Sequence, residues 1–227
     1  MEWNFDNVKY NGKDLDRVQV DGVTVWEKAK PKFYDYLQND GKSFIETNIA
    51  PKDIDEFYID ATIYDFVGSS AINTILGMRI GYEKPSLRLH LSKSPQTMMI
   101  NYGDDYKQKP LINPYTLGSN FKINFTRNQI TVTTIAGGTY SYNLEEQTYD
   151  GCTTSMILFS QRENTNEASV YRLKGRVYSL SFSNNGTLVR DFKPCLYNGQ
   201  AGLWDSVEGK FYGNANNKGT LTVGNDE

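Results

Sequence analysis

The sequence predicts an all-β protein whose bulk is one antiparallel β-sandwich of two sheets, of jelly-roll type, with a small β-hairpin module ahead of it. Hydrophobic and polar side chains alternate along many short segments, as they do in strands with one buried face. The segments between them are rich in Gly, Asn, Asp and Ser, which are turn formers. No long stretch has helical periodicity, and buried parallel strands would be apolar on both faces, so the pattern favours antiparallel sheets.

The first element is a hairpin within residues 1–31, which we assign to a separate N-terminal module with its linker. Residues 18–26 read VQVDGVTVW, and Asp21 and Gly22 can supply the positive φ angles of a two-residue turn. Asn11 and Gly12 form a second such pair. A lone hairpin is marginal in water, so we expect this module to pack on the main domain or on another copy of the chain. The charged linker KAKPK, residues 28–32, leads into a sandwich assigned to residues 32–227.

The strands of the sandwich follow from alternation with a period of two. Residues 57–64, 87–91, 98–102, 121–125 and 178–182 each place apolar side chains on one face and mostly polar ones on the other. This pattern predicts one face packed in the core and one face in water. It places Arg88, His90 and Asn101 on the solvent-exposed face.

Composition excludes several function classes. With 24 Lys and Arg against 27 Asp and Glu, the net charge of −3 gives no field that would attract nucleic acid or an anionic membrane. No apolar run approaches the ~20 residues that cross a bilayer, and residues 1–6 lack the features of a signal peptide, so we expect synthesis in the cytoplasm. Without a secretion signal, Cys152 and Cys195 are expected to be buried reduced thiols rather than a disulfide.

Two parts of the chain resemble concanavalin A/laminin-G-like domains of bacteriophage and gut-bacterial surface proteins. The first is FYDYLQNDGKSFIET at residues 33–47. The second comprises GRVYSLSF at 175–182, NGTLVRDFKPC at 185–195 and GLWDSVEGKFYGN at 202–214. The resemblance covers residues 33–224 and implies a concanavalin A-like jelly roll. It assigns a structural role to the closing motif, with Arg190 and Asp191 as ends of a buried ion pair and Trp204 and Tyr212 in the core; the motif residues are Arg190, Asp191, Pro194, Gly202, Trp204, Asp205, Phe211 and Tyr212.

The hairpin at residues 18–26 resembles short modules of phage tail and fibre proteins. Taken together, the two resemblances imply a bacteriophage virion structural protein, in a tail, a fibre or a capsid decoration. The N-terminal module would contact other virion subunits, and the sandwich would bind a bacterial surface glycan or another subunit. A homo-oligomer located in the virion is the expected form, because repeated sites compensate for weak affinity at each one.

Enzyme chemistry is not expected from this sequence. The Glu-x-Asp-x-x-Glu strand of retaining glycosidases is absent, and alternation leaves Glu56, Tyr58 and Asp60 on one face without a third carboxylate. His90, the only histidine, alternates with Leu89 and Leu91, and no Gly-x-Ser-x-Gly elbow is present, so an exposed imidazole on the sheet face explains it better than a general base. One His and two distant Cys also lack the ligand spacing of a zinc site. A carbohydrate-active enzyme, or its accessory carbohydrate-binding domain, remains one alternative, and a purely structural virion assembly protein without a glycan ligand is another.

The candidate glycan contacts combine an aromatic platform with planar polar groups, which together suit a pyranose ring. We place them on the loop at residues 102–106 and on the adjoining exposed face: Arg79, Arg88, His90, Asn101, Tyr102, Asp104, Asp105 and Tyr106. The Asp residues of this loop, or Asn184 and Asn185, would also offer oxygen ligands for Ca²⁺. Turn formation explains these residues better, so no cofactor is expected.

Overall fold

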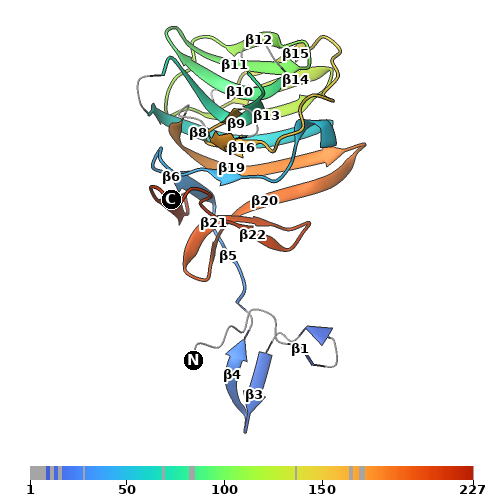
Figure 1. Cartoon of the computed structure of the whole chain (residues 1–227). Helices are drawn as coiled ribbons and strands as arrows, with labels where there is room; N and C mark the ends of the chain where they lie inside the picture. Colours follow the sequence, from blue (N-terminus) through green and yellow to red (C-terminus); the bar gives the residue numbers. More distant parts are fainter. Residues whose placement is uncertain are drawn as a thin grey trace.

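The computed structural model describes residues 9–10, 13–14, 17–27, 29–67, 70–81, 85–135, 137–163, 166–168 and 172–226. These residues form an antiparallel β-sandwich of two sheets, with two small two-stranded sheets ahead of it (Figure 1). The predicted all-β class is therefore confirmed. The one helical element among the described residues is a 3-10 turn at Pro51–Asp53, and none of the helices described is long and apolar enough to span a bilayer.

The larger sheet carries most of the chain. Its main path runs β15, β14, β13, β8, β19, β20, β21, β22, and β5, β6 and β23 join it beside this path. Its three longest strands, β8, β19 and β20, have 11, 12 and 11 residues and lie side by side in the middle of this path. The strands are β5 (Lys32–Phe33), β6 (Tyr36–Asn39), β8 (Glu56–Phe66), β13 (Asn120–Thr126), β14 (Gln129–Thr134), β15 (Thr139–Asn143), β19 (Leu173–Asn184), β20 (Thr187–Tyr197), β21 (Gln200–Asp205), β22 (Lys210–Tyr212) and β23 (Leu221–Gly224).

The smaller sheet packs against the larger one. Its path runs β12, β11, β10, β9, β16, β7, and β17 pairs with both β9 and β18. The strands at the two ends of the path are β12 and β7 in the smaller sheet, and β15 and β22 in the larger sheet. The strands are β7 (Ile45–Glu46), β9 (Ile72–Arg79), β10 (Ser86–Lys93), β11 (Gln96–Gly103), β12 (Lys107–Ile112), β16 (Ile157–Leu158), β17 (Arg162–Glu163) and β18 (Asn166–Ala168).

The N-terminal segment forms hairpins, as predicted. β3 (Arg17–Val20) pairs with β4 (Val23–Glu27), and the turn residues Asp21 and Gly22 have φ angles of 50° and 78°. β1 (Lys9–Tyr10) pairs with β2 (Lys13–Asp14), while the Asn11 and Gly12 pair lies outside the described residues. Figure 1 shows β3 and β4 away from the sandwich, joined to it through β5. The division at residue 32 stays a prediction.

The core lies between the sheets, where the alternation predicts it. Phe57, Ile59 and Ala61 of β8 are buried, and Leu89 and Leu91 of β10 are buried from the opposite layer. The Phe57 ring stacks on Phe125 at a centroid distance of 4.8 Å. Cys152 and Cys195 are buried free thiols, as expected, and burial raises the pKa of Cys195 to about 11.

The closing motif is held by a fully buried carboxylate. Asp205 accepts hydrogen bonds from the backbone N–H groups of Asp191 and Val207, both at 3.0 Å. Arg190 Nε lies 3.4 Å from Asp205 Oδ2, an ion-pair distance without hydrogen-bond geometry, and Arg190 Nη2 lies 2.6 Å from Glu208. Asp191 contacts Lys193 at 3.2 Å and Ser206 at 2.5 Å instead. Arg190 and Asp191 are thus not partners, because neighbouring strand residues point to opposite faces.

The aromatic residues of the closing motif divide between the two faces. Tyr212 is buried and donates a hydrogen bond to Glu208 at 2.6 Å. Trp204 is half-buried rather than in the core, because its neighbour Leu203 takes the inward position. Its ring packs beside Tyr197 at a centroid distance of 5.4 Å. The prediction of a core position is therefore wrong for Trp204.

Pro194 and Gly202 of the closing motif are buried. A Cβ at Gly202 would lie 2.4 Å from the Tyr212 carbonyl oxygen, next to the half-buried Phe211.

Candidate functional site

The predicted glycan-binding face is not exposed. Arg88, His90 and Asn101 are 2 %, 0 % and 0 % exposed, so the expectation of a wet face is wrong for this part of the smaller sheet. Gln161, which follows β16, crosses this face and accepts hydrogen bonds from Arg88 Nη1 at 3.0 Å and Thr74 Oγ1 at 2.8 Å. Arg88 Nη2 donates to Asn101 Oδ1 at 2.8 Å. Each of these side chains thus has a hydrogen-bond partner within the cluster, which indicates a structural role. Asn101 Nδ2 and Gln161 Nε2 are buried without a partner among the described residues.

His90 is electrically neutral in this cluster. Burial lowers its pKa to about 3, and the nearby positive charge of Arg88 acts in the same direction. A neutral, fully buried imidazole can neither attract an acidic ligand nor act as an accessible general base.

Three more of the predicted glycan contacts are either buried or hydrogen-bonded to a neighbouring loop. Arg79 and Tyr102 are buried, and the Tyr102 hydroxyl accepts a hydrogen bond from the Glu145 N–H at 3.2 Å. Asp104 accepts hydrogen bonds from Thr148 Oγ1 at 2.8 Å and from the Gly151 N–H at 3.1 Å, so its carboxylate anchors a neighbouring loop.

The last two members of the predicted set lie on the turn itself. Asp105 is exposed, and Tyr106 has a φ angle of 53°. The proposed Ca²⁺ loop gains no support from this arrangement. Within the described ranges, no group of three His, Cys, Asp or Glu residues lies close enough together to hold a metal ion.

A pocket is present elsewhere, at the lateral seam where β12 of the smaller sheet meets β15 of the larger. Along this seam Lys107 and Glu145 form an ion pair at 2.9 Å, and the Tyr142 hydroxyl donates a hydrogen bond to the Leu111 carbonyl oxygen at 2.5 Å. These contacts join the two sheets. Beyond Leu111 the seam opens into a pocket of about 550 Å³, a volume within the usual range for small-molecule sites.

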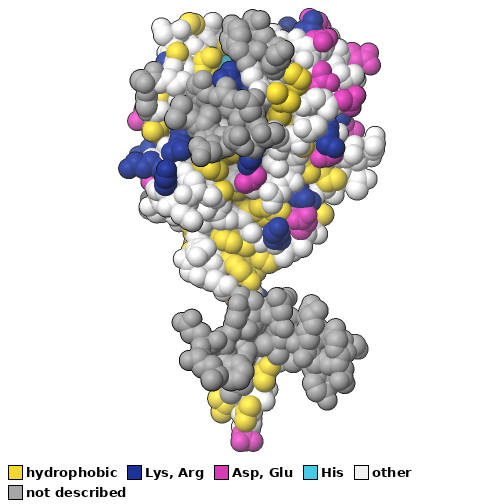
Figure 2. Space-filling view, in the orientation of Figure 1, with side chains coloured by type: hydrophobic (Ala, Val, Ile, Leu, Met, Phe, Trp, Pro, Cys, Tyr) yellow, Lys and Arg dark blue, Asp and Glu magenta, His cyan; other side chains and the backbone are white. Residues whose placement is uncertain are grey.

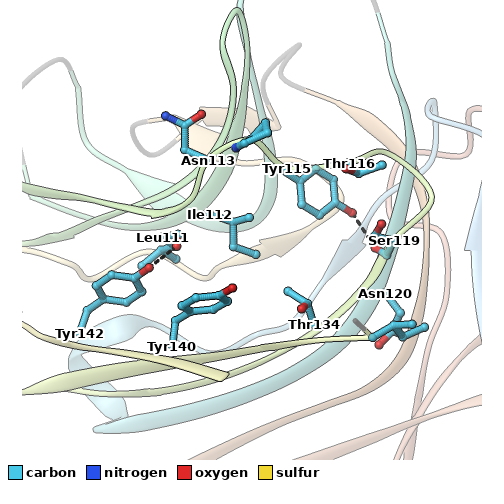
Figure 3. A pocket seen from close by; sticks show the side chains of 12 residues that line it. Leu111, Ile112, Asn113, Tyr115, Thr116, Ser119, Asn120, Thr134, Tyr140 and Tyr142 are labelled. Carbon is cyan, nitrogen blue, oxygen red and sulfur yellow. Dashed lines mark hydrogen bonds between the residues drawn. The ribbon is translucent and has the colours of Figure 1, made fainter. Parts of the chain in front are cut away.

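Four stretches of the chain line the pocket (Figure 3). They are the end of β12, the connection from β12 into the first residue of β13, the end of β14 with the residue that follows it, and β15. The lining residues are Leu111, Ile112, Asn113, Pro114, Tyr115, Thr116, Ser119, Asn120, Thr134, Ile135, Tyr140 and Tyr142.

Tyr140 contributes an exposed aromatic ring to the lining of the pocket. It pairs with the core residue Val132 across β14 and β15, and so belongs to the inward face of the larger sheet. Because β12 is the last strand of the smaller sheet on this side, Tyr140 is left 50 % exposed. Figure 3 shows its ring below Ile112, and both residues line the pocket. A Cβ on Gly138 would lie 2.8 Å from the Tyr140 hydroxyl oxygen, so the glycine leaves room for this ring.

Tyr115 forms the fixed back wall. It is buried, its hydroxyl donates a hydrogen bond to the Ser119 carbonyl oxygen at 2.8 Å, and it accepts one from the Ile63 N–H at 3.4 Å. Burial raises the pKa of its hydroxyl well above the ordinary value, so the ring stays neutral. The pocket is thus built against a rigid side chain.

Hydroxyl and amide groups surround the aromatic rings. Thr134 and Ser119 lie on the floor and at one side in Figure 3, and Asn113 lies at the rim with its amide directed outward. Asn120 donates a hydrogen bond to Asp60 at 2.7 Å. Sequence analysis missed this pocket, although the alternating tyrosines at positions 140 and 142 were a usable signal.

Comparison with known proteins supports the fold. By sequence, no protein family and no curated protein matches this chain. By structure, the chain is similar to a candidate carbohydrate-binding protein from Bacteroides ovatus ATCC 8483, with a TM-score of 0.55, 10% identity and coverage of 86% of this chain and 61% of that one.

Two further solved structures show a weaker similarity. The CBM40 of the Ruminococcus gnavus IT-sialidase, solved with α2,3-sialyllactose, has a TM-score of 0.47 at 10% identity and covers 68% of this chain and 91% of its own. Domains LG4-5 of the mouse laminin α1 chain have a TM-score of 0.44 at 11% identity and cover 80% and 48%. With TM-scores below 0.5, these two likenesses carry no argument about this chain. The likeness with a TM-score of 0.55 is at 10% identity, so it shows the fold alone, a sandwich of two antiparallel sheets.

Proposed function

We propose that this protein is a non-catalytic carbohydrate-binding domain and that its glycan occupies the seam pocket between β12 and β15. The observation that carries the proposal is the half-exposed ring of Tyr140, held over a pocket with hydroxyl groups at its floor and side. A pyranose presents an apolar face of C–H groups and an edge of hydroxyls, and this arrangement offers a partner for each. The similarity to a candidate carbohydrate-binding protein supports the same reading.

The chemistry of the pocket favours binding over hydrolysis. Its described lining residues include no carboxylate, imidazole or thiol. Asp60, the carboxylate that contacts the lining residue Asn120, lies on the outer face of β8, where it accepts the Asn120 hydrogen bond and lies 3.5 Å from Lys122 Nζ. Glycoside hydrolysis needs two carboxyl groups on either side of the scissile bond. The enzymatic alternative therefore finds less support in this site than the binding domain does.

A finer role is part of the proposal and rests on the two sequence resemblances alone. It is adhesion of a bacteriophage virion to a host-surface glycan, or contact with another virion subunit, with the hairpin module as the anchor. In a homo-oligomer, several shallow pockets would engage one surface together, and avidity would compensate for weak affinity at each of them. A virion protein without any glycan ligand is the competing reading.

Glycan-array binding of the purified chain and of Tyr140→Ala tests the proposal. We expect a defined set of glycans to bind the wild-type chain and to lose about tenfold or more in affinity with the variant, because one aromatic stacking contact is removed. Tyr64→Ala is the matched control, since Tyr64 is 36 % exposed on another strand and does not line the pocket. No binding to any glycan, or equal loss in both variants, contradicts the proposed function.

A further inference from the structure

The described lining of the seam pocket is uncharged, which is unusual for a protein in which 22% of the residues are charged. None of the twelve residues that line the pocket is Asp, Glu, Lys, Arg or His. The polar groups it offers are hydroxyls, amides and backbone groups, all neutral at physiological pH. This observation concerns which glycan the site accepts.

The charged side chains near the seam are engaged with other groups. Lys107 pairs with Glu145 at 2.9 Å, and the Lys109 Nζ lies over the Tyr142 ring at 5.8 Å from its centroid. Both lysines precede Leu111 on β12, and the pocket opens beyond that residue. The Asp60 and Lys122 pair lies on the outer face of the larger sheet, reached only through Asn120 at the rim.

An ionised ligand would therefore lose hydration without gaining a partner. Moving a carboxylate from water into a site that lacks a counter-charge is costly, and specific recognition of an acidic sugar normally uses an Arg or Lys that contacts the carboxylate. The arginines and the histidine that were predicted to offer such contacts are buried in the smaller sheet; they are Arg79, Arg88 and His90. A protonated amino sugar would equally lack a carboxylate in this pocket.

The geometry points to neutral sugar residues as the ligand class: unsubstituted or N-acetylated hexoses, with sialylated and uronic-acid glycans excluded. This inference rests on the proposed function. It predicts that the ring of Tyr140 and the apolar side chain of Ile112 contact the faces of a neutral pyranose, while Thr134 and Ser119 lie within reach of its hydroxyls.

Matched pairs of glycans that differ only in one carboxylate test the inference, for example asialo and sialylated forms of the same oligosaccharide and neutral and uronic-acid forms of the same polymer. We expect the neutral member of a pair to bind and the acidic member to bind about tenfold or more weakly. We also expect the affinity for the neutral member to stay constant between about 50 and 500 mM NaCl, since no ion pair is formed for salt to screen. Tyr140→Ala should abolish the preference by removing the binding itself.

A gain-of-function variant sharpens the same test. Thr134→Lys places an ammonium group in the lining, and we expect the variant to bind the acidic member of a pair more tightly than the wild-type chain does, with a salt dependence that the wild type lacks. Binding of acidic glycans by the wild-type chain that is lost in Tyr140→Ala would overturn the neutral-ligand inference while supporting the proposed function. Binding of neither member of any pair contradicts both.

Discussion

In two regions of this protein, the alternation of residues along a strand predicts the wrong solvent exposure, and it does so in opposite directions. On β10 and β11, Arg88, His90 and Asn101 alternate with leucines and other core residues, yet the folded chain buries them. At the seam between β12 and β15, Tyr140 also belongs to a strand with alternating residues, on the face that should be buried, yet it is half exposed. Alternation assigns a side chain to a face of its sheet. Whether that face is covered depends on another part of the chain.

The difference lies in which part of the chain packs on each of these two sheet faces. Gln161 contributes an acceptor to Arg88 and Thr74 and so joins the polar face to the segment after β16. At the seam the smaller sheet ends at β12, and the opposite strand β15 continues without a partner layer. Polar side chains on the face that Gln161 contacts are buried and stabilise the fold. The aromatic side chain of Tyr140, which no strand of the smaller sheet covers, stays exposed to solvent.

The largest effect is expected from Arg88→Met, which breaks the covered region. Removing the guanidinium leaves Gln161 Oε1 without one donor and Asn101 Oδ1 without its donor inside the protein, which should cost about 3 kcal/mol or more of unfolding free energy. Urea unfolding measures this loss. Lys193→Met is the control, because Lys193 is 54% exposed and its removal should change stability by less than about 0.5 kcal/mol. Equal unfolding curves for the two variants would show that the cluster is not structural.

The next effect is a dependence of stability on acid that comes from His90. Its pKa is lowered to about 3 in the folded chain, below its ordinary value of 6.5, because burial disfavours the charged form. Between these two pH values the unfolded chain binds a proton that the folded chain does not, so the unfolding free energy falls as pH falls, by up to about 1.4 kcal/mol per pH unit.

The measurement is urea unfolding at a series of pH values from about 6 to 4, with His90→Gln as the reference. Carboxylates contribute to both curves, and their share cancels in the difference. Since His90 is the only histidine, the wild-type curve should fall more steeply than that of the variant. Parallel curves would show that His90 is protonated in the folded chain.

The smallest effect is expected at the seam, from Tyr142→Phe. The variant loses the hydrogen bond to the Leu111 carbonyl oxygen, which should lower the unfolding free energy by about 1 kcal/mol. Tyr140→Phe is the matched control on the same strand. It should leave the thermal midpoint unchanged, because its hydroxyl makes no hydrogen bond to the described residues and half of the side chain is already exposed. A lower midpoint for Tyr140→Phe than for Tyr142→Phe would reverse our assignment of roles to the two tyrosines.

Local patterns were enough to predict much of the fold. The apolar positions at 57, 59 and 61 point inward as alternation requires, and Asp21 and Gly22 make the turn that their conformational freedom allows. The site depends on contacts that no local pattern contains. Gln161 meets Arg88 across 73 positions of sequence, and Tyr142 meets Leu111 across 31. A pattern with a period of two cannot say which sheet is wider or where its neighbour ends, and those facts decide which polar and aromatic groups meet water.

The position of the pocket at the rim of the sandwich has a consequence for the evolution of this fold. Its specificity would be set by side chains on an edge strand and on the connection between two strands, outside the tightly packed interior formed by residues such as Phe57 and Ile59. Substitutions at Tyr140 would therefore alter ligand preference with little loss of folding stability, because half of that side chain is already exposed. A lineage that carries this scaffold would diversify its recognition while keeping the same interior.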